Sequence, residues 1–198
     1  AGQQGLSDFS HPATEITIQG KVFSHLLYQF RFAYSGWRYV QVTLGGESYS
    51  ALADGLQSAL FRAGGSPIEH RTDSLSAAFN NRVEEQKLTQ SYEALCNHYN
   101  LQATRNNRGV SHENGAIECA HGSFKRRLDQ ALKRRGSRDF AAIKDYQAFL
   151  DSVTDRLNKR CQSRFQDEQL ALQALPDERF MDYSELSLKV TRSSTLEV

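Results

Sequence analysis

The sequence predicts an α/β fold, in which a sheet is flanked by helices, because strand-like and helix-like patterns alternate along the chain. Two aromatic and β-branched runs, LLYQFRFAY and WRYVQVTL, are separated by Ser35-Gly36 and predict an antiparallel hairpin. The segment SYSALADGLQSALFRAG then repeats apolar residues at helical spacing. The short runs IEHRT and LQATR, with a helical pattern between them, predict two further strands.

The composition is that of an ordinary globular protein. The 198 residues are 39% hydrophobic and 24% charged, with a formal net charge of +1. This balance gives no global electrostatic signature, so a surface for nucleic acid must come from local clusters. Three cysteines without framework spacing fit a reducing compartment, and no apolar run or signal peptide is recognisable. We therefore expect a soluble, cytoplasmic protein without disulfides or a membrane partner.

The first strand is expected in GLSDF and contains Asp8. Carboxylates are depleted in strands, so this one needs a reason. A functional role is one reason; exposure on an edge strand is the other. The next segment, TEITIQGKVFSH, predicts a small hairpin that turns at Gln19-Gly20.

A second carboxylate, Asp73, follows the strand-like IEHRT. Its position at the carboxyl end of a strand is where α/β sheets commonly place functional groups. The alternative is an N-cap, in which Asp73 accepts amide hydrogens of the helical turn expected in SLSAAF.

The third carboxylate lies in NNRGVSHENGAIECAHGSFKRRLDQALKRR. We expect a helix over 88–99 and, further along, a polar, glycine-punctuated loop over 106–115. A second helix then follows, with Glu118 on its first turns. Lys125 follows Glu118 by seven residues, so the two side chains share a helix face. This face would place a metal ligand beside a phosphate contact.

The remaining segments give the domain organisation. A second long helix is expected from Phe140 to Phe165, followed by a connector and by strand-like alternation near the end. We expect a main domain over 1–160, a connector over 161–181 and the start of a truncated β module over 182–198. Strand-like segments near both ends suggest a piece of a longer protein.

Two Cys-x-His pairs, at Cys96 and Cys119, resemble half-sites for zinc. Residues two apart on a helix diverge by about 200°, so neither pair converges on one ion if both segments are helical. His121, by contrast, shares a face with Glu118. The sequence contains no GxxxxGK[ST] loop, GxGxxG loop or serine elbow, which leaves nucleotide cofactors unsupported.

Asp8, Asp73 and Glu118 thus lie on three separate elements. Hard divalent ions such as Mg²⁺ or Mn²⁺ take oxygen ligands, and a two-metal site would suit phosphoryl transfer. Spacing alone does not show that the three carboxylates converge.

The motifs GLSDF, YSGWRYVQVTLGGES, EHRTDSLSAAF and TRNNRGVSHENGAIE, followed by the basic helix, occur in an order that resembles the integrase core of DDE transposases and retroviral integrases. The resemblance is greatest to IstA-type insertion-sequence transposases and covers most of the chain. It implies a ribonuclease-H-like fold with a mixed five-stranded sheet flanked by helices, with Asp8 on its central strand and Asp73 on the adjacent one.

The resemblance also selects the third acidic residue. Glu113 precedes the Asn-Gly pair, whereas the family's glutamate follows a glycine by a few residues, which selects Glu118. The separation between Asp73 and Glu118 is longer than in retroviral integrases, and the segment 88–99 can hold the excess. Full-length members carry an N-terminal helix-turn-helix part and a C-terminal β domain, so the chain would correspond to a catalytic core.

The implied function is divalent-metal-dependent cleavage and strand transfer on DNA, acting at element ends and target DNA. Arg105, Arg108, Lys125 and Arg126 would contact backbone phosphates, which position DNA without reading its sequence. The resemblance further implies an oligomeric assembly and an accessory ATPase. The alternatives are a catalytically silent DNA-binding or assembly module, and a metal-dependent nuclease that lacks strand transfer.

Overall fold

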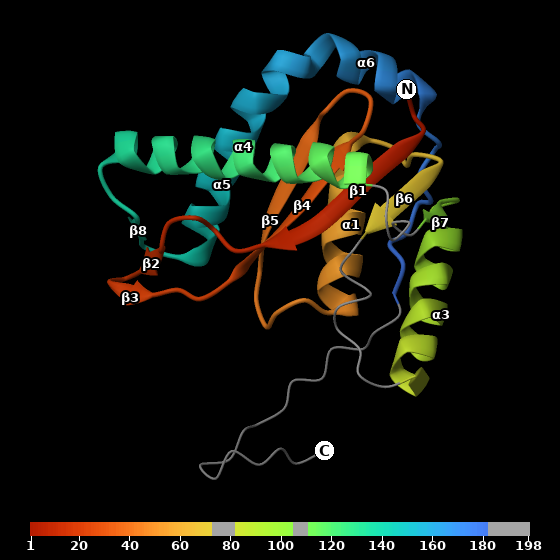
Figure 1. The fold of residues 1–198 in the computed structure, drawn as a ribbon, viewed down its shortest axis with the longest axis horizontal. Coiled ribbons are helices and arrows are strands. Elements are labelled where there is room, and N and C mark those ends of the chain that lie inside the picture. The colour runs from red at the N-terminus through yellow and green to blue at the C-terminus, as the bar shows by residue number, and fades with distance from the viewer. Residues whose placement is uncertain (73–81, 105–110, 182–198) are drawn as a thin grey trace.

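The computed structural model describes residues 1–72, 82–104 and 111–181 (Figure 1). Within this part, the side chains of 82–89 and 111–121 are not described. The expected turn in SLSAAF and the expected β module over 182–198 lie outside the described residues. No helix in the described ranges is both long and apolar enough to cross a bilayer.

A five-stranded mixed sheet forms the centre of the fold, with strand order β5-β4-β1-β6-β7. Its strands are β1 (Gln4–Ser10), β4 (Leu26–Phe32), β5 (Arg38–Thr43), β6 (Glu69–Thr72) and β7 (Gln102–Thr104). The first three pair antiparallel, whereas β6 is parallel to both β1 and β7. The predicted mixed five-stranded sheet is confirmed.

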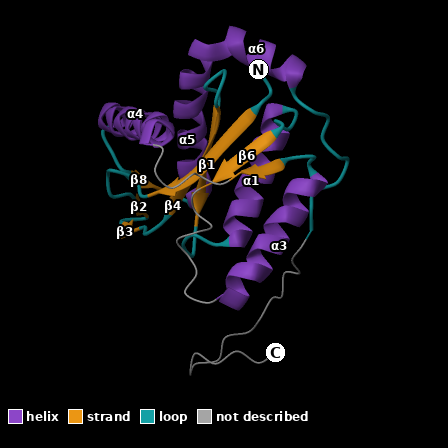
Figure 2. Ribbon diagram, turned by 45° about the vertical axis from the view of Figure 1, so that its right-hand side comes forward, coloured by secondary structure: helices purple, strands orange, loops and turns teal. Residues whose placement is uncertain are grey.

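Helices lie on both sides of this sheet (Figure 2). They are α1 (Tyr49–Ala63), α3 (Arg82–His98), α4 (Ser111–Arg135), α5 (Ile143–Asn158), a 3₁₀ turn (Lys159–Cys161) and α6 (Gln162–Ala171). In Figure 1, α4 crosses in front of the strands and α1 lies behind them. A small second sheet joins β2 (Thr17–Ile18), β3 (Lys21–Val22) and β8 (Asp139–Phe140).

Helix α1 has the boundaries that its sequence predicts. Ser48 caps its start by accepting a hydrogen bond from the Ala51 amide at 3.2 Å, and Gly64 ends it in the left-handed conformation with φ of 83°. Leu56 and Leu60 are fully buried against the sheet. The apolar stripe and both caps are therefore consistent with the same helix boundaries.

The two faces of the sheet support separate hydrophobic clusters. One cluster joins α1 and α3 to alternate residues of β1 and β4, including Phe9, Tyr28 and Phe30. The other joins α4 and α5 to Leu27 and Val40 on the opposite face. Because side chains alternate along a strand, neighbouring residues of β4 serve different clusters.

Two predicted boundaries are wrong. Helix α4 begins at Ser111, so the backbone of Asn114 and Gly115 is helical rather than part of the expected loop. A glycine inside a helix costs only about 1 kcal/mol relative to alanine. The described part of the helix packs on the core through Phe124 and Leu128, both buried, and this packing outweighs that cost.

The predicted long helix from Phe140 to Phe165 instead begins at Ile143, because Phe140 lies in β8. It is also divided at Cys161, where φ is −113° and ψ is 15°. The change in direction lets Phe165 stack on Trp37, with ring centroids 4.9 Å apart. It also brings the buried carboxylate of Glu168 within 2.7 Å of the Ser35 amide that donates to it. Residues 162–171 of the expected connector are therefore helical, while the division into domains stays a prediction.

Candidate active site

Asp8 lies on the central strand of the sheet. β1 pairs with β4 on one side and β6 on the other, so the alternative of an exposed edge strand is wrong. Ser7 and Phe9 are buried, and Asp8 between them is half-buried. The alternation of the strand therefore turns the Asp8 side chain away from the α1 cluster and toward the face that α4 covers.

The surroundings of Asp8 are polar. Its Oδ1 accepts a hydrogen bond of 2.8 Å from the Phe9 amide. Gln29 lies directly opposite on β4, and its Nε2 donates to Ser10 Oγ at 2.7 Å. Directly opposed residues of an antiparallel pair share a face, so Asp8, Ser10 and Gln29 form a polar patch at this end of β1.

The parallel strand β6 ends beside the Asp8 position. Its pairing with β1 runs as far as Ser7 opposite Thr72. Asp8 is the next residue in β1, and Asp73 is the next residue in the sequence after Thr72. Asp73 itself lies outside the described residues, so its N-cap alternative stays open.

A buried hydrogen-bond chain fixes the alignment of β1 with β6. His70 Nε2 lies 2.9 Å from Ser7 Oγ, and His70 Nδ1 lies 2.7 Å from the Tyr92 hydroxyl on α3. The imidazole is fully buried, and this burial lowers its pKa to about 3. A neutral ring thus links the strand that carries Asp8 to the strand that precedes Asp73.

Helix α4 carries the third predicted residue. Glu118 lies in this helix, seven residues before Lys125, and the backbone is helical between them. Lys125 is half-buried and Arg126 is exposed, so the described part leaves both cations near the surface. The side chain of Glu118 and both predicted phosphate contacts before the helix, Arg105 and Arg108, lie outside the described residues.

One acidic neighbour of Asp8 was missed by sequence reasoning. Glu47, in the loop between β5 and α1, has a pKa raised by partial burial and by the negative charge of Asp8, while His11 acts to lower it. No local motif marks Glu47, since it follows Gly45-Gly46 in an irregular segment. Only the tertiary fold brings it near the end of β1.

The Cys-x-His pair on α3 points its side chains apart. Cys96 is buried in the core, and burial raises the pKa of its thiol to about 12. His98 Nε2 instead lies 3.0 Å from the Glu178 carbonyl oxygen. Among the described side chains, no three His, Cys, Asp or Glu residues gather closely enough to hold a metal ion.

The chain has a sequence relative that is much longer than the chain itself. No family model matches the chain. Over 195 residues the chain is 48% identical to a Sinorhizobium fredii protein named "Uncharacterized protein y4jA/y4nE/y4sE". The match covers 97% of this chain but 39% of that protein, so the chain spans less than half of its relative.

Two solved structures have the same architecture. The catalytic core domain of BIV integrase superposes with a TM-score of 0.56 at 15% identity, covering 86% of this chain and 98% of that one. A chain of the simian T-cell lymphotropic virus intasome, solved with PP2A regulatory subunit B56 gamma, gives a TM-score of 0.59 at 14% identity. That match covers 100% of this chain and 67% of the other. The chain therefore has the α/β fold of integrase catalytic cores.

Proposed function

We propose that the chain is the catalytic core of a DNA transposase of the IstA type, a divalent-metal-dependent polynucleotidyl transferase. The observation that carries this proposal is the parallel pairing of β1 and β6, which ends at Ser7 and Thr72. Strand alternation would direct Asp73 to the face that already carries Asp8. Helix α4, which contains Glu118, packs over that same face through Phe124 and Leu128.

The donor set fits Mg²⁺ or Mn²⁺. Asp8 offers carboxylate oxygens from a half-buried position in a polar patch, and Asp73 and Glu118 would complete an all-oxygen set. When bound, a pair of such ions stabilises charge on the attacking and leaving oxygens of a phosphoryl transfer. The chain contributes the rigid centre of the sheet, where Asp8 is held between two paired strands.

Positive side chains would place the DNA. Lys125 shares a helix face with Glu118, so its ammonium would meet a phosphate near the reacting bond. Arg105, Arg108 and Arg126 would contact further phosphates. The partners proposed are element ends and target DNA, within an oligomeric assembly that an accessory ATPase assists.

The test is cleavage and joining of DNA by the wild type and by Asp8→Asn. The asparagine keeps an oxygen that can accept from the Phe9 amide, so the fold should persist while ligand charge is lost. With labelled duplex oligonucleotides, a plasmid target and Mg²⁺ or Mn²⁺, we expect the rate to fall at least about 100-fold. Glu47→Gln, a nearby acidic residue outside the proposed ligand set, should leave the rate within a few-fold.

The outcomes separate the alternatives. Equal activity of Asp8→Asn and wild type would refute the proposed site. Cleavage without joining would identify a nuclease that lacks strand transfer. DNA binding without cleavage at any metal concentration would identify a silent binding or assembly module.

A further inference from the structure

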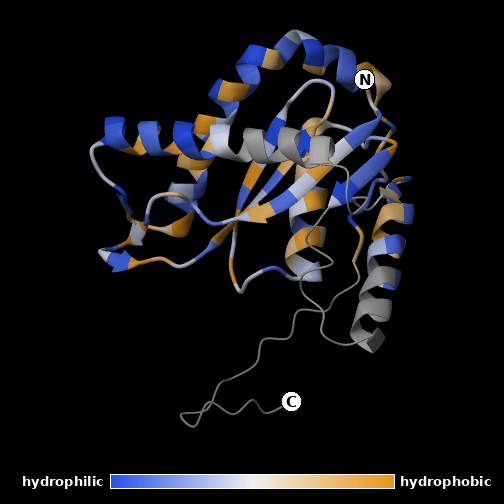
Figure 3. Cartoon of the chain, in the orientation of Figure 1, coloured by the Kyte–Doolittle hydropathy of each residue, from blue (hydrophilic) through white to orange (hydrophobic). Residues whose placement is uncertain are grey.

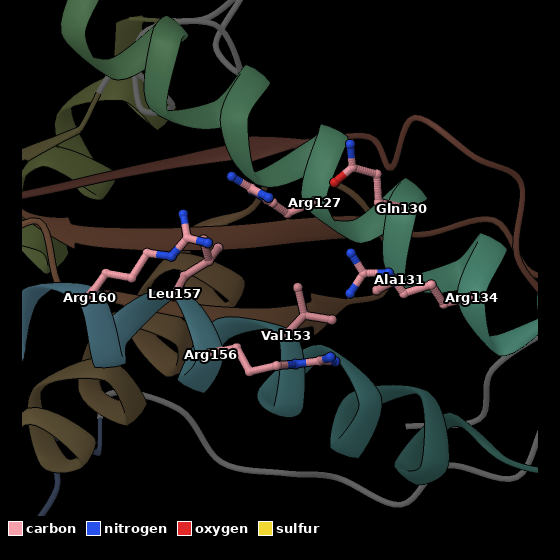
Figure 4. A pocket seen from close by; sticks show the side chains of 8 residues that line it. All are labelled: Arg127, Gln130, Ala131, Arg134, Val153, Arg156, Leu157 and Arg160. Carbon is pink, nitrogen blue, oxygen red and sulfur yellow. The ribbon is translucent and has the colours of Figure 1, made fainter.

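Helices α4 and α5 enclose a hollow of about 130 Å³ on the surface, shown in Figure 4. We call it the arginine groove. It is lined by Arg127, Gln130, Ala131, Arg134, Val153, Arg156, Leu157 and Arg160. Four arginines therefore surround one concavity that has no acidic residue in its lining.

The apolar lining residues anchor the groove to the core. Val153 is buried, and Ala131 and Leu157 pack against the same hydrophobic cluster as Phe124 and Leu128. The two helices that support the arginines are thus held together by their shared core. The floor of the groove is therefore part of the hydrophobic core.

The arginine charges are not neutralised by the described residues. All four side chains are exposed, and none forms an ion pair with another described residue. Two acidic residues of the same helices form ion pairs outside the groove. Asp129 pairs with Lys133 at 2.8 Å, and Asp155 pairs with Arg62 at 3.5 Å.

The spacing of the arginines suits an extended anion. Arg127 and Arg134 lie seven residues apart, so they share a face of α4 and are separated by about 10 Å along its axis. Arg156 lies in α5 and Arg160 lies four residues later, in the 3₁₀ turn, about 6 to 8 Å further along the axis. In Figure 4, Arg127 and Arg160 lie toward one end of the groove, and Arg134 and Arg156 toward the other.

This face of α4 differs from the one that carries Glu118. Arg127 follows Glu118 by nine residues, about two and a half helical turns, which places it on the opposite side of the helix. The buried stripe of Phe124, Leu128 and Leu132 lies between the two flanks. In Figure 3, the described half of α4 alternates hydrophilic residues, in blue, with hydrophobic ones, in orange.

We propose that the arginine groove binds the phosphate backbone of a second segment of duplex DNA, apart from the DNA held on the Glu118 flank. Planar guanidinium groups match phosphate oxygens, and the phosphates of one strand advance by about 3.4 Å per nucleotide. A span of about 10 Å is longer than one phosphate group, so Arg127 and Arg134 would contact different phosphates of the backbone. The binding would be independent of sequence.

The test measures binding of an unrelated 30-base-pair duplex without divalent metal, so that cleavage plays no part. The groove variant is Arg127→Ala/Arg134→Ala/Arg156→Ala/Arg160→Ala. Its matched control removes four exposed cations elsewhere, as Lys21→Ala/Arg138→Ala/Lys144→Ala/Arg164→Ala. Each lost phosphate contact lowers the slope of log affinity against log salt by about 0.9. We expect the magnitude of this slope to fall by about 2 to 3.6 in the groove variant and by less than about 1 in the control.

A second variant separates charge from packing. Replacing all four arginines by lysine keeps the charge and the aliphatic stems but loses the planar fork. We expect the salt slope to remain near that of the wild type, with affinity lowered only a few-fold. Circular dichroism of every variant should match the wild type, because the substituted side chains are exposed.

Two results would overturn this inference. One is a groove variant that binds duplex as well as its control does. The other is unchanged DNA binding together with an altered sedimentation coefficient, which would make the groove an interface between copies of the chain. Asp8→Asn should retain binding at the groove. The chain could therefore lack metal-dependent cleavage and still bind DNA at the groove. It could equally cleave DNA and show no binding at the groove.

Discussion

The two faces of the central sheet are built differently. On the α1 and α3 side, large apolar residues such as Tyr28, Phe30 and Leu56 are fully enclosed. On the α4 and α5 side, apolar packing involves Leu27 and Val40, whereas the half-buried Asp8 and the buried Gln29 form a polar patch at the end of β1. One face contributes mainly to stability, and the other combines apolar packing with a polar patch around Asp8.

Glycine substitutions test this comparison with the largest expected effect. A Cβ on Gly55 in α1 would lie 2.5 Å from Cδ1 of the buried Tyr28, whereas a Cβ on Gly122 in α4 would meet nothing within 4 Å. We expect Gly55→Ala to lower the free energy of unfolding by about 1–3 kcal/mol through overpacking. Gly122→Ala should raise it by about 0.5–1 kcal/mol through helix propensity.

Urea denaturation of both variants measures these changes. If both substitutions raise the free energy of unfolding by the same amount, α1 is not packed closely against β4. A loss of stability in Gly122→Ala would show that this flank of α4 is covered, and the contrast between the faces would then be wrong.

The buried imidazole of His70 gives the next largest effect. The pKa of this group is about 3 in the folded chain, so below its ordinary value of about 6.5 only the unfolded chain takes up the proton. Stability should therefore fall as pH decreases from 6.5 toward 3, by up to about 1.4 kcal/mol per pH unit from this group. The variant His70→Gln lacks this contribution.

Denaturation from pH 8 to pH 4.5 tests the assignment. The difference in stability between wild type and His70→Gln should narrow as pH falls below 6.5. A difference that stays constant across this range would mean that His70 has the same pKa in the folded and unfolded chains, and that the α1 and α3 face is open to water there.

The smallest effect concerns the polar patch around Asp8, on the α4 and α5 face. The charge of Asp8 contributes to the raised pKa of Glu47, so Asp8→Asn should lower that pKa toward its ordinary value. Titration of the Glu47 carboxyl by NMR measures the shift, with Asp54→Asn as a control on α1. An unchanged Glu47 pKa in Asp8→Asn would show that the two carboxylates do not interact.

Local sequence signals were sufficient for much of the fold. The hairpin between β2 and β3 turns at Gln19 and Gly20, with φ of 50° and 74°, as the sequence predicts. Gly36, with φ of 78°, lies in the predicted turn between β4 and β5. These features depend on residues close together in the chain, where glycine conformation and side-chain alternation decide the outcome.

Other features depend on contacts that local patterns do not contain. Glu168 accepts hydrogen bonds from the amides of Gly2 and Ser35, both more than 130 residues away in sequence. Nothing in the polar sequence of α6 distinguishes this buried carboxylate from its exposed neighbours. The arginine groove is similar, because α4 supplies two of its charges, while α5 and the 3₁₀ turn that follows it supply one each.

The candidate site was predicted in part. The position of Asp8 on a central strand followed from the resemblance to integrase cores, and the structure confirms that placement. The proximity of Glu47 did not follow, since it depends on how the loop before α1 approaches β1. The convergence of Asp8, Asp73 and Glu118 stays a prediction.

A crystal structure with Mn²⁺ tests that convergence most directly. Anomalous scattering locates the ions, and Mn²⁺ is a hard ion that takes carboxylate oxygens as Mg²⁺ does. We predict one or two ions at the carboxyl end of β1, coordinated by Asp8 and Asp73 and approached by Glu118. Ordered Mn²⁺ at other sites, with Asp8 and Asp73 uncoordinated, would contradict the proposed active site.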